Sequence, residues 1–226
     1  MGQCCSNQHH VLGEEFVSHL LQNPSLNLRF FTYNKLLNEI VSKRVQQEIK
    51  KKHIDELLIP QFYDTTSKDN TAIYYKNIFD YILTQLQEVN NMYIVILYFY
   101  PFINHEDEKC EETMYGIFQY ISQKLTVQAL EDNLLKYITF CTQGLTYAIW
   151  NKCDDPNIVS ALDELNTNVY NSQNIKKFVD QIMFDIKRNS NGTNSIVNKE
   201  DFKKILLKWD ISSAESTRAM MTSVFS

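Results

Sequence analysis

The chain has 226 residues, of which 44% are hydrophobic and 22% are charged, so it can bury one sizeable core. Its formal net charge of −5 argues against a nucleic-acid partner, because phosphate binding requires a basic surface. Five glycines and four prolines are too few for the closely spaced turns of a sheet protein, so these observations together predict an all-α fold.

The first six residues, MGQCCS, match the N-myristoylation pattern M-G-x-x-x-[ST]. Removal of the initiator methionine leaves Gly2 as the acceptor amine, and Ser6 completes the pattern. One myristoyl chain gives only marginal membrane binding, on the order of 10⁴ M⁻¹, so stable anchoring requires a second signal. Cys4 and Cys5 lie where palmitate could supply that signal. We therefore predict that residues 1–11 form a flexible lipid-anchor segment.

An alternative interpretation of this segment is a metal half-site that combines the two cysteines with His9 and His10. Adjacent ligands in each pair lack the spacing that lets both reach one tetrahedral ion, so lipidation is the favoured interpretation. The segment also lacks the positive start and apolar middle of a cleavable signal peptide. These features predict a peripheral protein on the cytoplasmic face of a membrane.

The first predicted helix covers residues 14–22 and ends at Asn23-Pro24, because the residue before a proline avoids the α conformation. A longer helical zone is predicted from Thr32 to Leu58, where Pro60 closes it. Its expected apolar stripe is Leu36, Leu37, Ile40, Val41, Val45 and Ile49.

This zone contains the one basic patch of an acidic chain. The patch consists of Lys43, Arg44, Lys50, Lys51 and Lys52. It could contact anionic lipid headgroups, at about 1 kcal/mol for each cation near the surface. The favoured interpretation is an ordinary solvated helix face.

Two helices are predicted next, over residues 72–89 and 92–100. The inward side chains of the first are predicted to be Ile73, Ile78, Phe79, Ile82 and Leu86. The second lies in the longest apolar run, residues 92–103, which is interrupted by Pro101 and is shorter than the roughly 20 residues of a membrane span. We therefore expect a buried core helix there.

Further helical periodicity follows residues 104–112 and continues to a predicted internal boundary at residues 151–157. Asp154-Asp155-Pro156 predicts the start of a helix, because carboxylates favour the positive end of the helix dipole and proline suits the first turn. Three shorter helices are expected at residues 158–170, 175–187 and 199–209. The helical domain is therefore predicted to span residues 12–210, followed by a C-terminal tail at 211–226.

Residues 178–209 have the order of an EF-hand: apolar helix, polar loop, a single isoleucine, glutamate and apolar helix. With Ile196 at the eighth loop position, the calcium-facing positions are Asn189, Asn191, Thr193 and Glu200. The loop offers one carboxylate among these positions, and Asn194 replaces the glycine expected at position six. The sequence therefore predicts no firmly bound cofactor and leaves calcium at this loop as an alternative.

The same frame fits residues 62–82, where Thr66 is the first loop position and Asn77 replaces the glutamate at the twelfth. With a myristoylatable start and two such units, the chain resembles EF-hand superfamily proteins with degenerate loops. It is most similar in layout to the helical N-terminal half of TLD-domain proteins, without the TLD domain itself, and more distantly similar to calcineurin-B-like proteins and neuronal calcium sensors. The resemblance implies a compact multi-helix domain built from EF-hand-like helix-loop-helix units.

No common catalytic motif occurs in the sequence: it has no P-loop, no G-x-S-x-G and no H-E-x-x-H. We therefore predict a lipid-anchored adaptor without catalytic activity, which binds a membrane through its acyl chains and a protein of unknown identity. Two alternatives stay open: a calcium-responsive sensor that uses the loop 189–200, and a structural component of a cytoskeletal or membrane-lining assembly.

Overall fold

The computed structural model describes residues 3–42, 54, 59–64, 66, 71–86, 92–105 and 110–225. Within these ranges every regular element is helical, and the one β-type pairing is an isolated antiparallel bridge between Thr126 and Ile196. The prediction of an all-α, compact multi-helix fold is confirmed.

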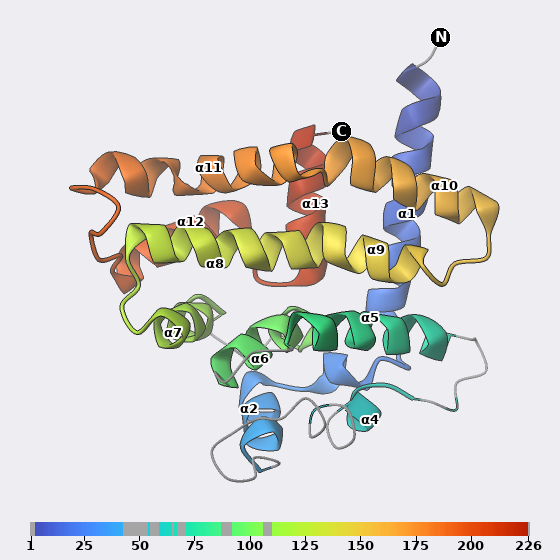
Figure 1. Cartoon of the computed structure of the whole chain (residues 1–226), viewed down its shortest axis with the longest axis horizontal. Coiled ribbons are helices and arrows are strands. Elements are labelled where there is room, and N and C mark those ends of the chain that lie inside the picture. The colour runs from blue at the N-terminus through green and yellow to red at the C-terminus, as the bar shows by residue number, and fades with distance from the viewer. Residues whose placement is uncertain are drawn as a thin grey trace.

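The elements follow one another in chain order (Figure 1). The first half contains α1 (Gln3–Gln22), η1 (Asn27–Phe30), α2 (Tyr33–Ser42), α4 (Ile59–Phe62), α5 (Thr71–Gln85), α6 (Met92–Phe99) and η3 (Tyr100–Phe102). The second half contains α7 (Cys110–Ser122), α8 (Val127–Thr139), η4 (Phe140–Gly144), α9 (Leu145–Trp150), α10 (Pro156–Glu164), η5 (Leu165–Val169), α11 (Ser172–Asn189), α12 (Lys199–Trp209) and α13 (Ala214–Phe225).

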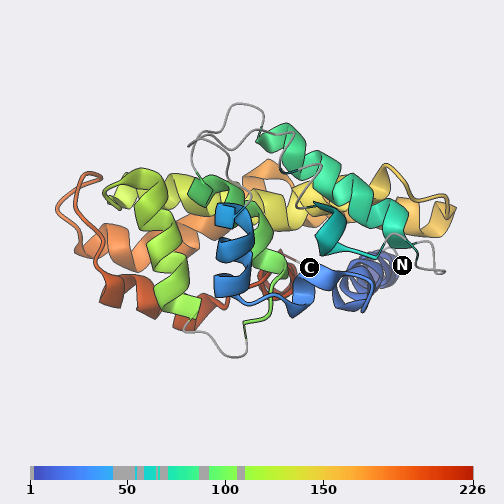
Figure 2. The ribbon, with the colours of Figure 1, turned by 90° about the horizontal axis from the view of Figure 1, so that it is seen from below.

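A continuous rod of α8, η4 and α9 runs through the middle of the molecule (Figure 1). α11 packs along one side of this rod and α5 packs on the other, while α13 crosses it at η4 and α1 packs across α10 (Figures 1 and 2). Figure 2 looks nearly along the axis of α1 and shows that this helix stands across the others.

The rod is buried because its apolar residues recur every three or four positions along its length. Its fully buried residues include Leu130, Leu134, Ile138, Cys141, Leu145 and Ile149. Each large aliphatic side chain buried in this way contributes about 1.5–3 kcal/mol relative to exposure. The rod therefore forms the centre of the hydrophobic core.

The start of α10 follows the sequence prediction. Asp155 is the N-cap, and its carboxylate accepts a hydrogen bond from the backbone N–H of Asn157 at 2.9 Å. Pro156 occupies the first helical position, where it has no intrahelical hydrogen bond to lose. The predicted end of the first helix at Asn23-Pro24 is also observed.

Several element boundaries and side-chain orientations differ from the predictions. Of the zone predicted from Thr32 to Leu58, the structure describes α2 and Ile54, and the remainder after Ser42 lies outside the described residues. Pro60 lies inside α4 rather than after a helix. Val41 and Ile73, both predicted to face inward, are exposed. Val41 lies about 100° around α2 from the buried Ile40, which places it outside the core-facing stripe.

Both ends of the described chain are helical. We expected the fold to begin near Leu12, but α1 already begins at Gln3. The expected tail contains α13, whose buried side includes Ala214, Thr217, Arg218 and Met221. The helical packing therefore extends into both terminal segments.

Candidate functional site

The predicted acylation segment leads directly into α1. Gly2 lies outside the described residues, while Cys4 and Cys5 fall in the first turn of the helix, without described side chains. Farther along α1, Val11 and Leu12 are 54% and 38% exposed. The N-terminal turns of α1 project past α10 at the edge of the molecule (Figure 1). Whatever modifies this N-terminus is therefore attached to a helix of the folded body.

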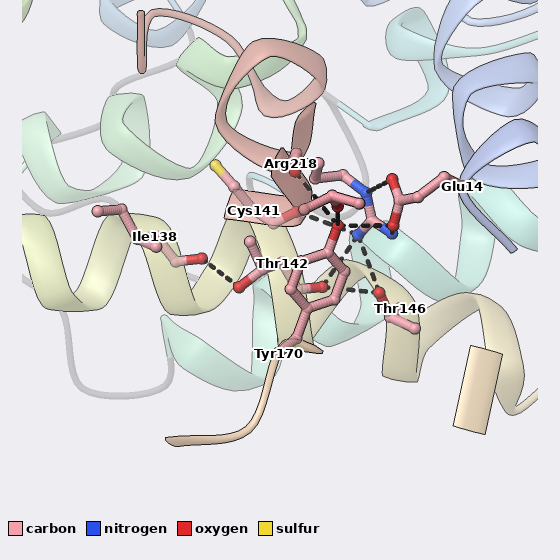
Figure 3. A network of polar contacts seen from close by, with 8 residues as sticks. Glu14, Ile138, Cys141, Thr142, Thr146, Tyr170 and Arg218 are labelled. Carbon is pink, nitrogen blue, oxygen red and sulfur yellow. Dashed lines mark hydrogen bonds and ion pairs between the residues drawn. The ribbon is translucent and has the colours of Figure 1, made fainter. Parts of the chain in front are cut away.

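A buried ion pair fastens α1 to α13 (Figure 3). Nη2 of Arg218 lies 2.7 Å from Oε1 of Glu14, and Nε of the same arginine donates to Oε2 at 3.1 Å. The Arg218 side chain is 2% exposed, and the two residues are 204 positions apart in sequence. A bidentate pair of this kind fixes both the distance and the relative orientation of the two helices.

The π-helical turn η4 and the first turn of α9 supply the remaining acceptors for the guanidinium. Nη1 of Arg218 donates to the carbonyl oxygens of Cys141 at 3.3 Å and Thr142 at 3.1 Å, and to Oγ1 of Thr146 at 2.9 Å (Figure 3). A π-turn disturbs the regular α-helical hydrogen-bond ladder, so its carbonyls can turn toward another partner. Burial disfavours the charged guanidinium, but the neighbouring Glu14 carboxylate raises the pKa of Arg218 above its usual value.

Tyr170 closes the network from the end of η5 (Figure 3). Its hydroxyl donates to Oε1 of Glu14 at 2.6 Å and lies 2.9 Å from Oγ1 of Thr222, while the Arg218 guanidinium lies 4.8 Å from its ring centroid. Burial raises the pKa of Tyr170 well above its usual value, so the phenol stays protonated and serves as a donor. We call Glu14, Arg218, Tyr170 and their hydrogen-bond partners the α1–α13 clamp.

Further contacts hold α1 along its length. Glu215 of α13 accepts hydrogen bonds from Ser18, at 2.9 Å, and from Gln22. The hydroxyl of the buried Tyr75 donates to the carbonyl oxygen of Leu20 at 2.8 Å. Where α1 crosses α10, Gly13 is buried and allows close approach. α1 is therefore an integral part of the fold.

We expect Gly13→Val to lower the free energy of unfolding by about 1–3 kcal/mol through overpacking. A Cβ atom at this position would lie 2.6 Å from Cδ1 of Leu165 and 3.2 Å from the carbonyl oxygen of Ala161. The measurement is chemical denaturation followed by circular dichroism. Gly116→Val in α7 is the matched control, because a Cβ there would meet no atom within 4 Å. An equal loss in both variants would contradict a tight α1–α10 crossing.

The predicted calcium loop lies between α11 and α12 and pairs with the α7–α8 connection. The backbone N–H of Val127 donates to the carbonyl of Ser195 at 2.9 Å, and that of Val197 donates to the carbonyl of Leu125 at 2.8 Å. The loop that pairs with residues 190–198 is therefore the connection before α8. Sequence reasoning missed this partner because residues 122–127 do not fit the calcium-loop pattern.

The structure leaves all four predicted calcium-facing residues, Asn189, Asn191, Thr193 and Glu200, exposed to solvent. The side chain of Asn198 caps α12 by accepting from the backbone N–H of Asp201 at 2.8 Å, and Asp201 pairs with Lys204 at 2.8 Å. No group of three or more His, Cys, Asp or Glu side chains that could hold a metal ion occurs among the described residues. A capped helix start therefore closes this loop.

The predicted basic patch, which consists of Lys43, Arg44, Lys50, Lys51 and Lys52, lies outside the described residues.

Sequence reasoning missed the α1–α13 clamp, although one signal for it was present. Arg218 shares the i, i+3, i+4, i+7 spacing of Ala214, Thr217 and Met221, so a charge falls on the buried side of a helix. A charge at such a position indicates a buried partner, but the spacing does not identify that partner as Glu14.

None of the helices in the described ranges is long and apolar enough to span a membrane. No protein-family model matches the chain, and neither the curated proteins nor the solved structures contain a protein that it matches.

Proposed function

We propose that this protein is a lipid-anchored peripheral membrane adaptor on the cytoplasmic face, without catalytic activity. The observation that carries the proposal is the sequence MGQCCS, with Gly2 as the myristoylation site and Cys4 and Cys5 as palmitoylation sites. Two or more chains would make release from the bilayer slow, whereas a single myristoyl chain binds reversibly.

The packing of α1 supports this proposal by giving the anchor a mechanical connection to the body. The helix that begins at Gln3 contains Glu14, which is tied to Arg218 by a buried bidentate pair. An anchor attached to a packed helix would restrict how the domain is oriented at the bilayer, whereas a long flexible linker would leave the orientation free. Confinement and orientation together raise the effective concentration of a weakly binding partner at the membrane.

We further propose that the body belongs to the EF-hand type with degenerate loops. Two helix-loop-helix units, α7–α8 and α11–α12, pack against each other, and their loops join through the Thr126–Ile196 bridge. This pairing supports a role for the loops in holding the two units together. The binding of a protein partner by this body is inferred from the helical architecture and the anchor.

The test is cell fractionation of the wild-type protein, Gly2→Ala and Cys4→Ser/Cys5→Ser, combined with intact mass spectrometry. We expect the wild type in the membrane pellet, Gly2→Ala in the soluble fraction, and the double cysteine variant divided between the two. Hydroxylamine should remove thioester-linked palmitate from the wild type and leave the myristoyl mass. Gly116→Ala serves as a control glycine substitution outside the motif. An unmodified N-terminus and identical distribution of all variants would contradict the proposal.

A further inference from the structure

Two helix ends without Asp, Glu, Lys or Arg lie on the same side of the molecule (Figure 1). Residues 1–13 and 219–226 contain no Asp, Glu, Lys or Arg, although these residues make up 22% of the chain. α1 and α13 run antiparallel, because Glu14 pairs with Arg218 while Ser18, farther along α1, bonds to Glu215, earlier in α13. The start of α1 and the end of α13 therefore point the same way (Figure 1).

This uncharged end also exposes apolar side chains. Val11 and Leu12 on α1 are exposed, and Val224 near the end of α13 is 38% exposed. The clamp places these residues on the same side as the N-terminal turns, where the acyl chains would be attached. The stretch next to the proposed anchor, up to residue 13 on α1 and from residue 219 on α13, is therefore free of acidic and basic side chains, and the exposed Glu15 marks its limit on α1. Such a stretch suits contact with a bilayer.

α11 lies along the same edge of the molecule and runs away from α1 (Figure 1). One side of α11 packs on α8. The exposed positions follow helical spacing and are Gln173, Lys177, Gln181, Phe184 and Arg188. Phe184, at the centre of this stripe, is 60% exposed. An aromatic ring flanked by long cationic side chains is typical of a helix face that lies in a membrane interface.

The net charge of the stripe is positive once ion pairs are considered. The flanking Asp180 is bound by Lys176 at 3.3 Å and Lys187 at 3.1 Å, and Asp185 pairs with Lys208 at 3.2 Å. Neither Lys177 nor Arg188 forms an ion pair within the part of the chain that the structure describes. The two cations are therefore available to lipid phosphates and carboxylates.

We propose that the uncharged end of α1 and α13, together with the outer stripe of α11, is the surface that lies against an anionic lipid bilayer. In this arrangement Val11, Leu12 and Phe184 contact the acyl boundary, while Lys177 and Arg188 bind anionic headgroups. The inference rests on the proposed lipid anchor, since the acylated N-terminus brings this surface to the membrane.

The experiment uses full-length protein that is myristoylated and carries Cys4→Ser/Cys5→Ser, so that the single chain leaves vesicle binding marginal and measurable. Affinity is measured by sedimentation with phosphatidylcholine vesicles, with and without about one third phosphatidylserine. We expect about 10-fold tighter binding to the anionic vesicles despite the net charge of −5, because both headgroup-facing cations are attracted by the negative surface potential of the bilayer. Lys177→Gln/Arg188→Gln should abolish this preference, and Phe184→Ala should weaken binding to both vesicle types.

The matched controls are Lys124→Gln/Lys136→Gln, two exposed lysines elsewhere, and Ile73→Ala, an exposed apolar residue on α5. Both should bind as the parent protein does. The proposed surface is wrong if the parent protein shows no preference for anionic vesicles, if Lys177→Gln/Arg188→Gln keeps that preference, or if the lysine control loses it equally. None of these results would contradict the lipid-anchor proposal. If the myristoylated protein binds neither vesicle type, the lipid-anchor function itself fails.

Discussion

Replacing Arg218 with methionine is expected to lower the free energy of unfolding by about 3–5 kcal/mol. The substitution keeps an unbranched side chain but leaves the Glu14 carboxylate without its cationic partner, and the π-turn carbonyls without their donor. The cost comes mainly from the polar groups that lose their partner: the buried π-turn carbonyls and the Glu14 carboxylate, whose side chain is 22% exposed and so keeps part of its solvation. Denaturant titration of the wild type and the variant measures the difference.

Two further variants separate the clamp from general effects of losing an arginine. Arg188→Met removes an exposed arginine and should change stability by less than about 0.5 kcal/mol. Arg218→Met/Glu14→Leu removes both charges, so it should recover a large part of the loss. A double variant as unstable as Arg218→Met alone would mean that the carbonyl and hydroxyl contacts, not the ion pair, carry the stabilisation.

The second large effect is a loss of stability in mild acid that depends on His105. The ring nitrogens of His105 are buried, and the imidazole lies 4.6 Å from the Tyr100 ring between centroids. Burial lowers the pKa of His105 from 6.5 to about 4, although the Asp210 carboxylate acts in the opposite direction. The unfolded chain therefore binds the proton more readily than the folded protein does.

This pKa difference determines the sign of the pH dependence. Its contribution to stability is fully present above pH 6.5 and is lost as the pH falls from 6.5 to about 4. The loss approaches about 3 kcal/mol at the acid end of this window. His105→Phe keeps the aromatic contact without the titration, so its denaturation midpoint should vary much less with pH. Parallel curves for the two proteins between pH 7 and pH 4 would contradict this assignment.

Local patterns predicted the elements whose cause is local. Asp155-Pro156 begins α10 because a carboxylate cap and a proline in the first turn act within a few residues. The helix at α8 was predicted from apolar periodicity for a similar reason, since the spacing of Leu130, Leu134 and Ile138 determines the face that is buried. Val41 and Ile73 were assigned wrongly because periodicity alone does not determine how wide the covered stripe is.

The loop pairing and the packing of the C-terminal helix depend on contacts between distant parts of the chain, so the sequence alone did not predict them. The loop before α12 pairs with the connection before α8, about 70 residues earlier, and nothing in residues 122–127 resembles the expected calcium loop. The terminal segment 211–226 is rich in small and polar residues, and its role became evident only through the burial of Arg218. Contacts between side chains that are far apart in sequence produce no periodic pattern from which they could be predicted.

The sequence by itself determined the all-α class, through its scarcity of turn residues and its helical periodicity, and it also provides the acylation motif as a purely local signal. Only the tertiary structure decided that the N-terminal helix is clamped to the C-terminal one and that their uncharged ends share one edge with the outer stripe of α11. The physical reason is that a buried arginine requires an anionic partner, and which residue supplies it depends on the fold. Glu14 pairs with Arg218 only because the fold places α1 beside α13.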